Sequence, residues 1–249
     1  ERREWERLLR GPDFFTVDRA TRKSIESITR DDLFAFHRKH FHPRHFVLAV
    51  AGDVTAADIL PRLEKALGDW AKTPPVLEKA PPVPEPSHEL RSGVYLVNKP
   101  DVNQGRVSLG HLAARRDHPD YHALWLMNHI LGGPVFTARL YSRIRSDEGL
   151  AYEARSDLQL GVYYPGTFRA YFQTKSESVG KATGLVLAEI EKLRTVKISS
   201  EELSAAVRYA VGSFPKAFST PLSTAGVFAQ DELTGRDPSF WRTFQDKVR

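Results

Sequence analysis

The residues from Arg145 to Tyr152 read Arg-Ser-Asp-Glu-Gly-Leu-Ala-Tyr. This stretch is the most informative part of the sequence for predicting the fold. We expect Ser142–Asp147 to end a helix and Ala151–Leu160 to begin a strand, with Glu148-Gly149-Leu150 as the turn between them. Glycine adopts the positive φ that such a turn often needs without a steric penalty. The pattern therefore predicts that Arg145 and Tyr152 lie together at one mouth of a domain.

Strand and helix patterns surround this stretch. Further strands are expected at Val94–Val97, Arg106–Leu112 and Thr167–Thr174, the last forming a hairpin with Ala151–Leu160 around Tyr164-Pro165-Gly166. Further helices are expected at Pro119–Leu131, Val135–Ser146, Ser176–Leu193 and from Ser199 to about Phe214. The strands come in adjacent pairs and do not alternate singly with helices. This order favours an α+β fold in layers over a doubly wound sheet.

The part of the chain before residue 73 has its own helix and strand signals. Thr29 can cap a helix that Pro43 stops, because Asp31 and Asp32 follow in the first turn, where negative charge is favourable. The unbroken apolar run Phe46–Ala51 predicts a strand that is buried on both faces. Thr55 then caps a second helix that ends at Gly68.

A proline-rich segment separates the two halves of the chain. Six prolines lie between Thr73 and Ser87, and their fixed φ and missing N–H groups favour an extended, stiff linker. We therefore divide the chain into residues 1–72, a linker at 73–90, and residues 91–249. Two α+β units joined by this linker are the predicted organisation.

Composition excludes several classes of protein and site. The chain has 249 residues with 41% hydrophobic and 27% charged residues, which are globular values. It has no Cys, so disulfide scaffolds, Cys-ligated zinc and iron–sulfur clusters are excluded. The net charge of +5 is not gathered on one stripe, which argues against nucleic-acid binding. No apolar run approaches the roughly 18 residues of a membrane span. The chain opens on Glu1-Arg2-Arg3 without a signal peptide or initiator Met, so we interpret it as a piece of a longer protein.

Two stretches resemble the insulinase-like zinc metallopeptidases, the family of pitrilysin and the mitochondrial processing peptidases. The first runs from Ser27 to Leu33, continues at His42-Pro43 and ends in Leu48–Val54; it is similar to the end of one homologous domain. The second is Leu131-Gly132-Gly133, then Phe136–Leu140, then Arg145–Tyr152; it is similar to the signature of the next domain. The resemblance implies a mixed, largely antiparallel sheet layered with helices. Residues 1–72 would then be the C-terminal part of a first peptidase-like domain, and residues 91–249 a second one, truncated at its C-terminus.

The family's zinc site is missing from this sequence. Its motif is His-x-x-Glu-His, in which two histidines one helical turn apart bind the metal and the glutamate activates the bound water. His118 and His122 have the right separation, but Tyr121 stands where the Glu should be. A second group of histidines consists of His37, His40, His42 and His45. No carboxylate lies among them, and they are surrounded by the positive charges of Arg38, Lys39 and Arg44, which disfavours metal binding. We therefore expect no metal ligands and no cofactor in this piece, with zinc held by an upstream domain or a partner chain.

The resemblance implies a role for Arg145 and Tyr152. In the family, the domain opposite the zinc supplies an Arg and a Tyr seven residues apart, which bond the substrate near the scissile carbonyl. A fixed donor there can lower the barrier, because charge develops on the carbonyl oxygen in the transition state. Without the surrounding motif, the same two residues would read as a surface charge and a strand aromatic.

Three classes of function remain open. The first is the non-zinc segment of a peptidase, inactive alone, which works on a peptide substrate with a zinc-bearing domain or subunit in a homo- or heterodimer. The second is a catalytically inactive scaffold or binding subunit of the same fold. The third is an unrelated basic binding module, which no sequence motif supports. The presence of both Arg145 and Tyr152 favours the first class. The compartment stays open, with the bacterial periplasm or cytoplasm favoured.

Overall fold

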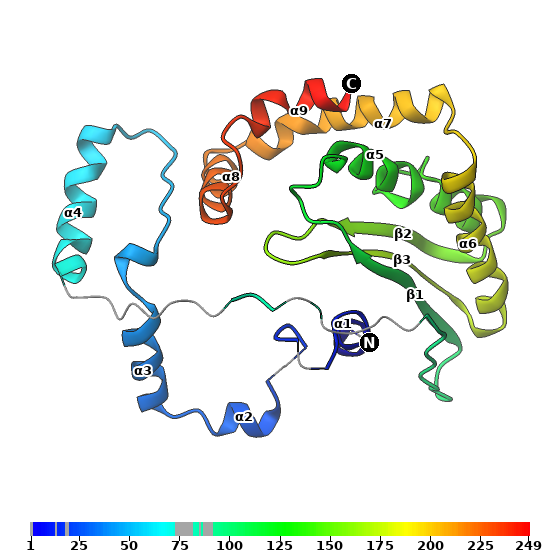
Figure 1. The fold of residues 1–249 in the computed structure, drawn as a ribbon, viewed down its shortest axis with the longest axis horizontal. Coiled ribbons are helices and arrows are strands. Elements are labelled where there is room, and N and C mark those ends of the chain that lie inside the picture. Colours follow the sequence, from blue (N-terminus) through cyan, green and yellow to red (C-terminus); the bar gives the residue numbers. More distant parts are fainter. Residues whose placement is uncertain (1, 13, 18–19, 73–81, 85, 87–91) are drawn as a thin grey trace. The chain divides into compact units, whose positions relative to one another are not determined.

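The structure is a computed structural model, and it describes residues 2–12, 14–17, 20–72, 82–84, 86 and 92–249 (Figure 1). The α-helices are α1 (Arg2–Arg10), α2 (Arg22–Glu26), α3 (Arg30–His40), α4 (Ala56–Lys72), α5 (Tyr121–Gly132), α6 (Val179–Thr195), α7 (Ser200–Ser213), α8 (Pro221–Thr234) and α9 (Phe240–Val248). The strands are β1 (Gln104–Ala113), β2 (Ala151–Gln159) and β3 (Gly166–Lys175). Short 3-10 helices are η1 (Pro43–His45), η3 (Ser176–Ser178) and η4 (Phe214–Phe218), and η2 (Tyr141–Asp147) is a π-helix.

The three strands form one antiparallel sheet with the order β1-β3-β2. Leu109 of β1 faces Ala170 of β3, and Ala154 of β2 faces Phe172 of β3. The predicted hairpin is thus confirmed as the β2–β3 pair. An antiparallel sheet combined with helices confirms the predicted α+β fold (Figure 1).

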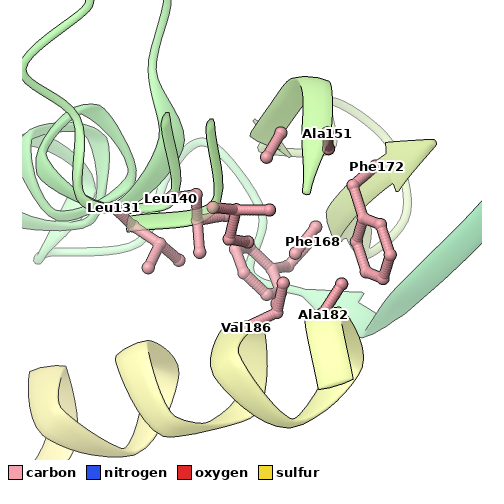
Figure 2. Close-up of a cluster of buried hydrophobic side chains, with 10 residues drawn as sticks. Leu131, Leu140, Ala151, Phe168, Phe172, Ala182 and Val186 are labelled. Atoms are coloured by element: carbon pink, nitrogen blue, oxygen red, sulfur yellow. The ribbon is translucent and has the colours of Figure 1, made fainter. Parts of the chain in front are cut away.

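The core lies between this sheet and helices α5, η2 and α6. Side chains alternate along β3, so that Phe168, Ala170 and Phe172 are buried while the residues between them are more exposed. Figure 2 shows Ala182 and Val186 of α6 next to Phe168 of β3. Leu131 and Leu140 belong to the same buried cluster. This packing fixes the helix that carries Arg145 against the sheet that carries Tyr152.

Helix α1 is attached to the turn between β2 and β3. The Arg10 side chain is only 5% exposed; it bonds Glu6 at 2.8 Å and the carbonyl of Pro165 at 2.8 Å. Its guanidinium carbon lies 5.1 Å from the ring centre of Phe14 and 4.8 Å from that of Tyr164. A buried arginine costs desolvation energy unless its donors are satisfied, and here an acid, a carbonyl and two rings satisfy them.

The chain divides into two compact units. One comprises residues 1–17, 83–212 and 243–249, and it contains the whole sheet; the other comprises residues 18–82 and 213–242. In the second unit Phe46 and His37 pack on Trp70, with ring centres 5.4 and 5.9 Å away. These units are the parts of the chain that pack together. They do not test where homologous domains begin along the sequence, so the domain boundaries at residues 72 and 91 stay predictions. Most of the predicted linker lies outside the described residues.

Two predicted strands are wrong. Phe46–Ala51 and Val94–Val97 carry no strand pairing among the described residues, although both are apolar. Leu48 is 59% exposed and Leu96 88% exposed, so the predicted burial also fails. A strand needs a neighbour that accepts and donates its backbone hydrogen bonds, and an apolar run alone does not supply one.

The predicted helix at Val135–Ser146 is partly correct. Its regular part begins only at Arg139, and from Tyr141 onward it is the π-helix η2. The preceding residues Val135 and Phe136 form turns instead, with the Val135 N–H bonded to the carbonyl of Gly133 at 2.8 Å. A π-helix has i→i+5 hydrogen bonds and appears frequently at functional sites.

Candidate functional site

The π-helix η2 is held in place by two fully buried side chains. Leu140 and Ile144 are 0% exposed and belong to the core cluster with Leu131 and Val186. Arg145 follows Ile144 directly and is half-buried. Because Ile144 is fixed, the backbone of Arg145 is fixed at the edge of the core.

A short turn connects Arg145 to Tyr152. The N–H of Gly149 donates to the carbonyl of Arg145 at 3.1 Å, and the N–H of Leu150 donates to the carbonyl of Ile144 at 2.9 Å. Gly149 has a φ of 61°, as the sequence predicts for this turn. The helix end, the turn and the strand start at Ala151 are therefore confirmed.

Tyr152 sits in an irregularity at the start of β2. The register between β2 and β3 shifts between Ala151 and Ala154, which is a β-bulge. Bulges re-aim side chains and are frequent next to active sites. Ala151 and Ala154 are buried, whereas Tyr152 is 83% exposed. The bulge thus anchors the strand on both sides of a tyrosine that faces solvent.

The structure brings Arg145 and Tyr152 together. The guanidinium carbon of Arg145 lies 4.7 Å from the ring centre of Tyr152, within the range of a cation–π contact. A third residue joins them, because the guanidinium carbon also lies 4.8 Å from the ring centre of Tyr141 and its Nη1 donates to the Tyr141 hydroxyl. The sequence analysis missed Tyr141. Its only signal is an aromatic residue four positions before an arginine on a predicted helix.

Ion pairs fasten both ends of η2 to neighbouring helices. Arg139, just before η2, forms a bidentate salt bridge with Glu202 of α7. Its Nε donates to Oε1 at 2.6 Å and its Nη2 donates to Oε2 at 2.9 Å. Glu148, just after η2, pairs with Lys181 of α6 at 2.6 Å. The hydrogen bond from Lys181 lowers the pKa of Glu148, so this carboxylate stays ionised. The element that carries Arg145 is therefore tied at two points besides the core.

The histidines and carboxylates that the structure describes do not fit a zinc site. Among the described residues, no three His, Asp or Glu side chains lie close enough together to hold a metal ion. His118 lies before α5 and accepts from the N–H of Asp120 at 3.2 Å, while His122 lies on α5 with its Nε2 buried. His42 accepts from the N–H of Arg44 at 3.1 Å, and His37 stacks on Trp70 and Phe41. That the chain binds no zinc stays a prediction.

The site can donate hydrogen bonds to an oxygen that carries developing negative charge. Arg145 has five N–H donors, one of which is directed to Tyr141. Tyr152, whose ring contacts the guanidinium, offers an O–H donor. The described part of the chain holds two donors side by side at an exposed edge, which suits recognition of a carbonyl or an oxyanion.

Comparisons with known proteins identify the family. The family model described as the peptidase M16 inactive domain matches residues 27–209, so the chain belongs to that family. An uncharacterized zinc protease of Mycobacterium leprae is 29% identical over 181 residues, which cover 69% of this chain and 40% of that protein. A protein of Helicobacter pylori named a non-peptidase homolog is 28% identical over 200 residues, which cover 78% of this chain and 44% of that protein.

Solved structures share the fold. The peptidase M16 inactive domain from Pseudomonas fluorescens superposes with a TM-score of 0.81 at 24% identity, covering 99% of this chain and 58% of that one.

The matched part of the chain spans less than half the length of the two curated relatives from Mycobacterium leprae and Helicobacter pylori. Within the residues that the structure describes, no helix is both long enough and apolar enough to cross a membrane.

Proposed function

We propose that this chain is the non-zinc-binding segment of an insulinase-like zinc peptidase, and that Arg145 and Tyr152 donate hydrogen bonds to the peptide substrate near its scissile carbonyl. Hydrolysis itself is carried out by a zinc-bearing homologous domain, either upstream in the same chain or on a partner in a homo- or heterodimer. Relatives named zinc proteases support this assignment.

One observation carries the proposal. Arg145 and Tyr152 come from different elements, yet the guanidinium carbon of Arg145 lies 4.7 Å from the ring centre of Tyr152. A buried helix end, a glycine turn and a β-bulge support this contact. A pair of donors on such rigid supports is pre-organised and needs no rearrangement when charge develops on the substrate. The tyrosine is 83% exposed and thus accessible to a substrate.

A second candidate is a catalytically inactive scaffold of the same fold. The relative in Helicobacter pylori that is named a non-peptidase homolog favours it. Such a scaffold has no use for a donor pair, so the two candidates differ in what the loss of Arg145 or Tyr152 does.

The test is steady-state hydrolysis of peptides by the full-length protein together with its zinc-bearing domain or subunit. We expect Tyr152→Phe to lower kcat about 10²–10³-fold, because it removes one hydrogen bond made chiefly in the transition state. Arg145→Ala should lower kcat and also raise KM, because its charge contacts the ground state too.

Exposed residues of the same types serve as matched controls. Tyr163→Phe and Arg194→Ala change a tyrosine that is 53% exposed and an arginine at the end of α6, and both should leave kcat/KM unchanged. If Tyr152→Phe and Arg145→Ala also keep the wild-type kcat/KM in an active assembly, the scaffold candidate is favoured instead.

A further inference from the structure

Tyr141 contacts the arginine of the proposed donor pair and has no role in the proposed function so far. Its hydroxyl accepts a hydrogen bond from Nη1 of Arg145, and its ring centre lies 4.8 Å from the guanidinium carbon. The guanidinium group therefore contacts two tyrosine rings, one from η2 and one from β2.

Tyr141 and Arg145 meet because they lie four residues apart on the same helical element. Side chains at this spacing are neighbours on the surface of a helix. The buried Ile144 holds this element at the edge of the core, so the tyrosine and the arginine lie together there.

Tyr141 is the better anchored of the two rings. It is half-buried, it follows the fully buried Leu140, and its ring packs edge-on against Phe136 with centres 5.0 Å apart. Tyr152, in contrast, is 83% exposed and has its hydroxyl available to a substrate. The ring of Tyr141 is therefore suited to hold the arginine, and that of Tyr152 to act beside it.

We propose that Tyr141 is a positioning residue that fixes the Arg145 guanidinium in the orientation that meets the substrate. An arginine side chain has many rotamers, and contact with a ring and a hydroxyl selects among them before substrate arrives. Tyr141 consumes one N–H of Arg145 and leaves the others available. This inference rests on the proposed function, because it assigns Tyr141 a task only if Arg145 meets substrate.

The first experiment is a double-mutant cycle on peptide hydrolysis by the full-length, zinc-loaded assembly. We expect Tyr141→Leu to lower kcat/KM about 10-fold, since small misplacements of a binding group are costly. Tyr141→Phe keeps the ring and should lose less. In an Arg145→Ala background, Tyr141→Leu should have no further effect, because the residue acts only through Arg145. Tyr163→Leu is the control at an exposed tyrosine.

The second experiment observes the arginine directly. In the NMR spectrum of the wild-type protein, the Nε–H signal of Arg145 should be shifted by the ring currents of Tyr141 and Tyr152, and Tyr141→Leu should remove the part that comes from Tyr141. An unchanged signal overturns the inference, and so does a wild-type kcat/KM for Tyr141→Leu when Arg145→Ala is impaired. If Arg145→Ala itself is fully active while the shift is present, the proposed function has failed and the inference falls with it.

Discussion

Gly149 sets the spacing between Arg145 and Tyr152. Its φ of 61° lies in the left-handed region, which costs other residues about 1–2 kcal/mol. We predict that Gly149→Ala lowers the free energy of unfolding by about that amount in urea titrations. Among the described residues, no atom beyond the two chain neighbours lies within 4 Å of the added methyl group, so the loss would come from the backbone and not from a clash.

Gly184 is the matched control for this prediction. It lies in the interior of α6, is exposed, and also has nothing within 4 Å of an added methyl group. Gly184→Ala should therefore stabilise the protein by about 0.5–1 kcal/mol, because alanine favours a helix interior. Equal effects of the two substitutions would show that the turn at Gly149 does not depend on glycine.

At the scale of single residues, the sequence predicted the positions of Arg145, Gly149 and Tyr152 but not the partner Tyr141. The turn follows from local rules for glycine, and the helix and strand beside it follow from apolar patterns. The contact of Tyr141 with Arg145 follows from an i,i+4 spacing on a helix, which many residue pairs share and which does not by itself indicate that two given side chains touch.

At the scale of elements, the bond between Arg139 and Glu202 joins η2 to α7. The two side chains are 15% and 31% exposed, so water screens the pair only in part. We predict that Arg139→Met lowers the free energy of unfolding by about 1–3 kcal/mol at pH 7, as expected for hydrogen bonds to a charged group. The exposed pair of Arg194 and Glu191 is the control, and Arg194→Met should cost at most about 0.5 kcal/mol.

The pH dependence of this effect has a defined sign. The hydrogen bond from Arg139 lowers the pKa of Glu202 in the folded protein below the ordinary value of 4.5. The contribution of the pair is therefore fully present above pH 4.5 and is lost as the pH falls through the lowered folded-state pKa. Urea titrations over this range should show the wild-type protein and Arg139→Met converge at low pH. A constant difference between them would contradict the role given to Glu202.

The elements differ in how far local sequence determines them. Thr29 caps α3 as predicted, because its hydroxyl accepts from the N–H of Asp32 only three residues away. The runs Phe46–Ala51 and Val94–Val97 were wrongly predicted as strands, because strand formation depends on a neighbouring strand, and local sequence does not determine which segment supplies it. Helix ends are thus encoded nearby, whereas strand pairing is not.

At the scale of the whole molecule, the absence of the zinc motif leads to a prediction about composition. We expect the purified 249-residue chain to hold no stoichiometric zinc after dialysis and to cleave no peptide, because the sequence lacks His-x-x-Glu-His. Elemental analysis by mass spectrometry and a peptide-cleavage assay measure the two quantities. One tightly bound zinc per chain with histidine ligands would overturn the prediction.

The exposed apolar segment at Val94–Val97 has a consequence for how this chain behaves at high concentration. Val94, Leu96 and Val97 are 80–97% exposed. An uncharged run of β-branched, aromatic and aliphatic residues at a surface is a template on which other chains can add as strands. Copies of the 249-residue chain handled alone should therefore scatter more light as they are concentrated, and a lysine in place of Leu96 should keep the solution clear.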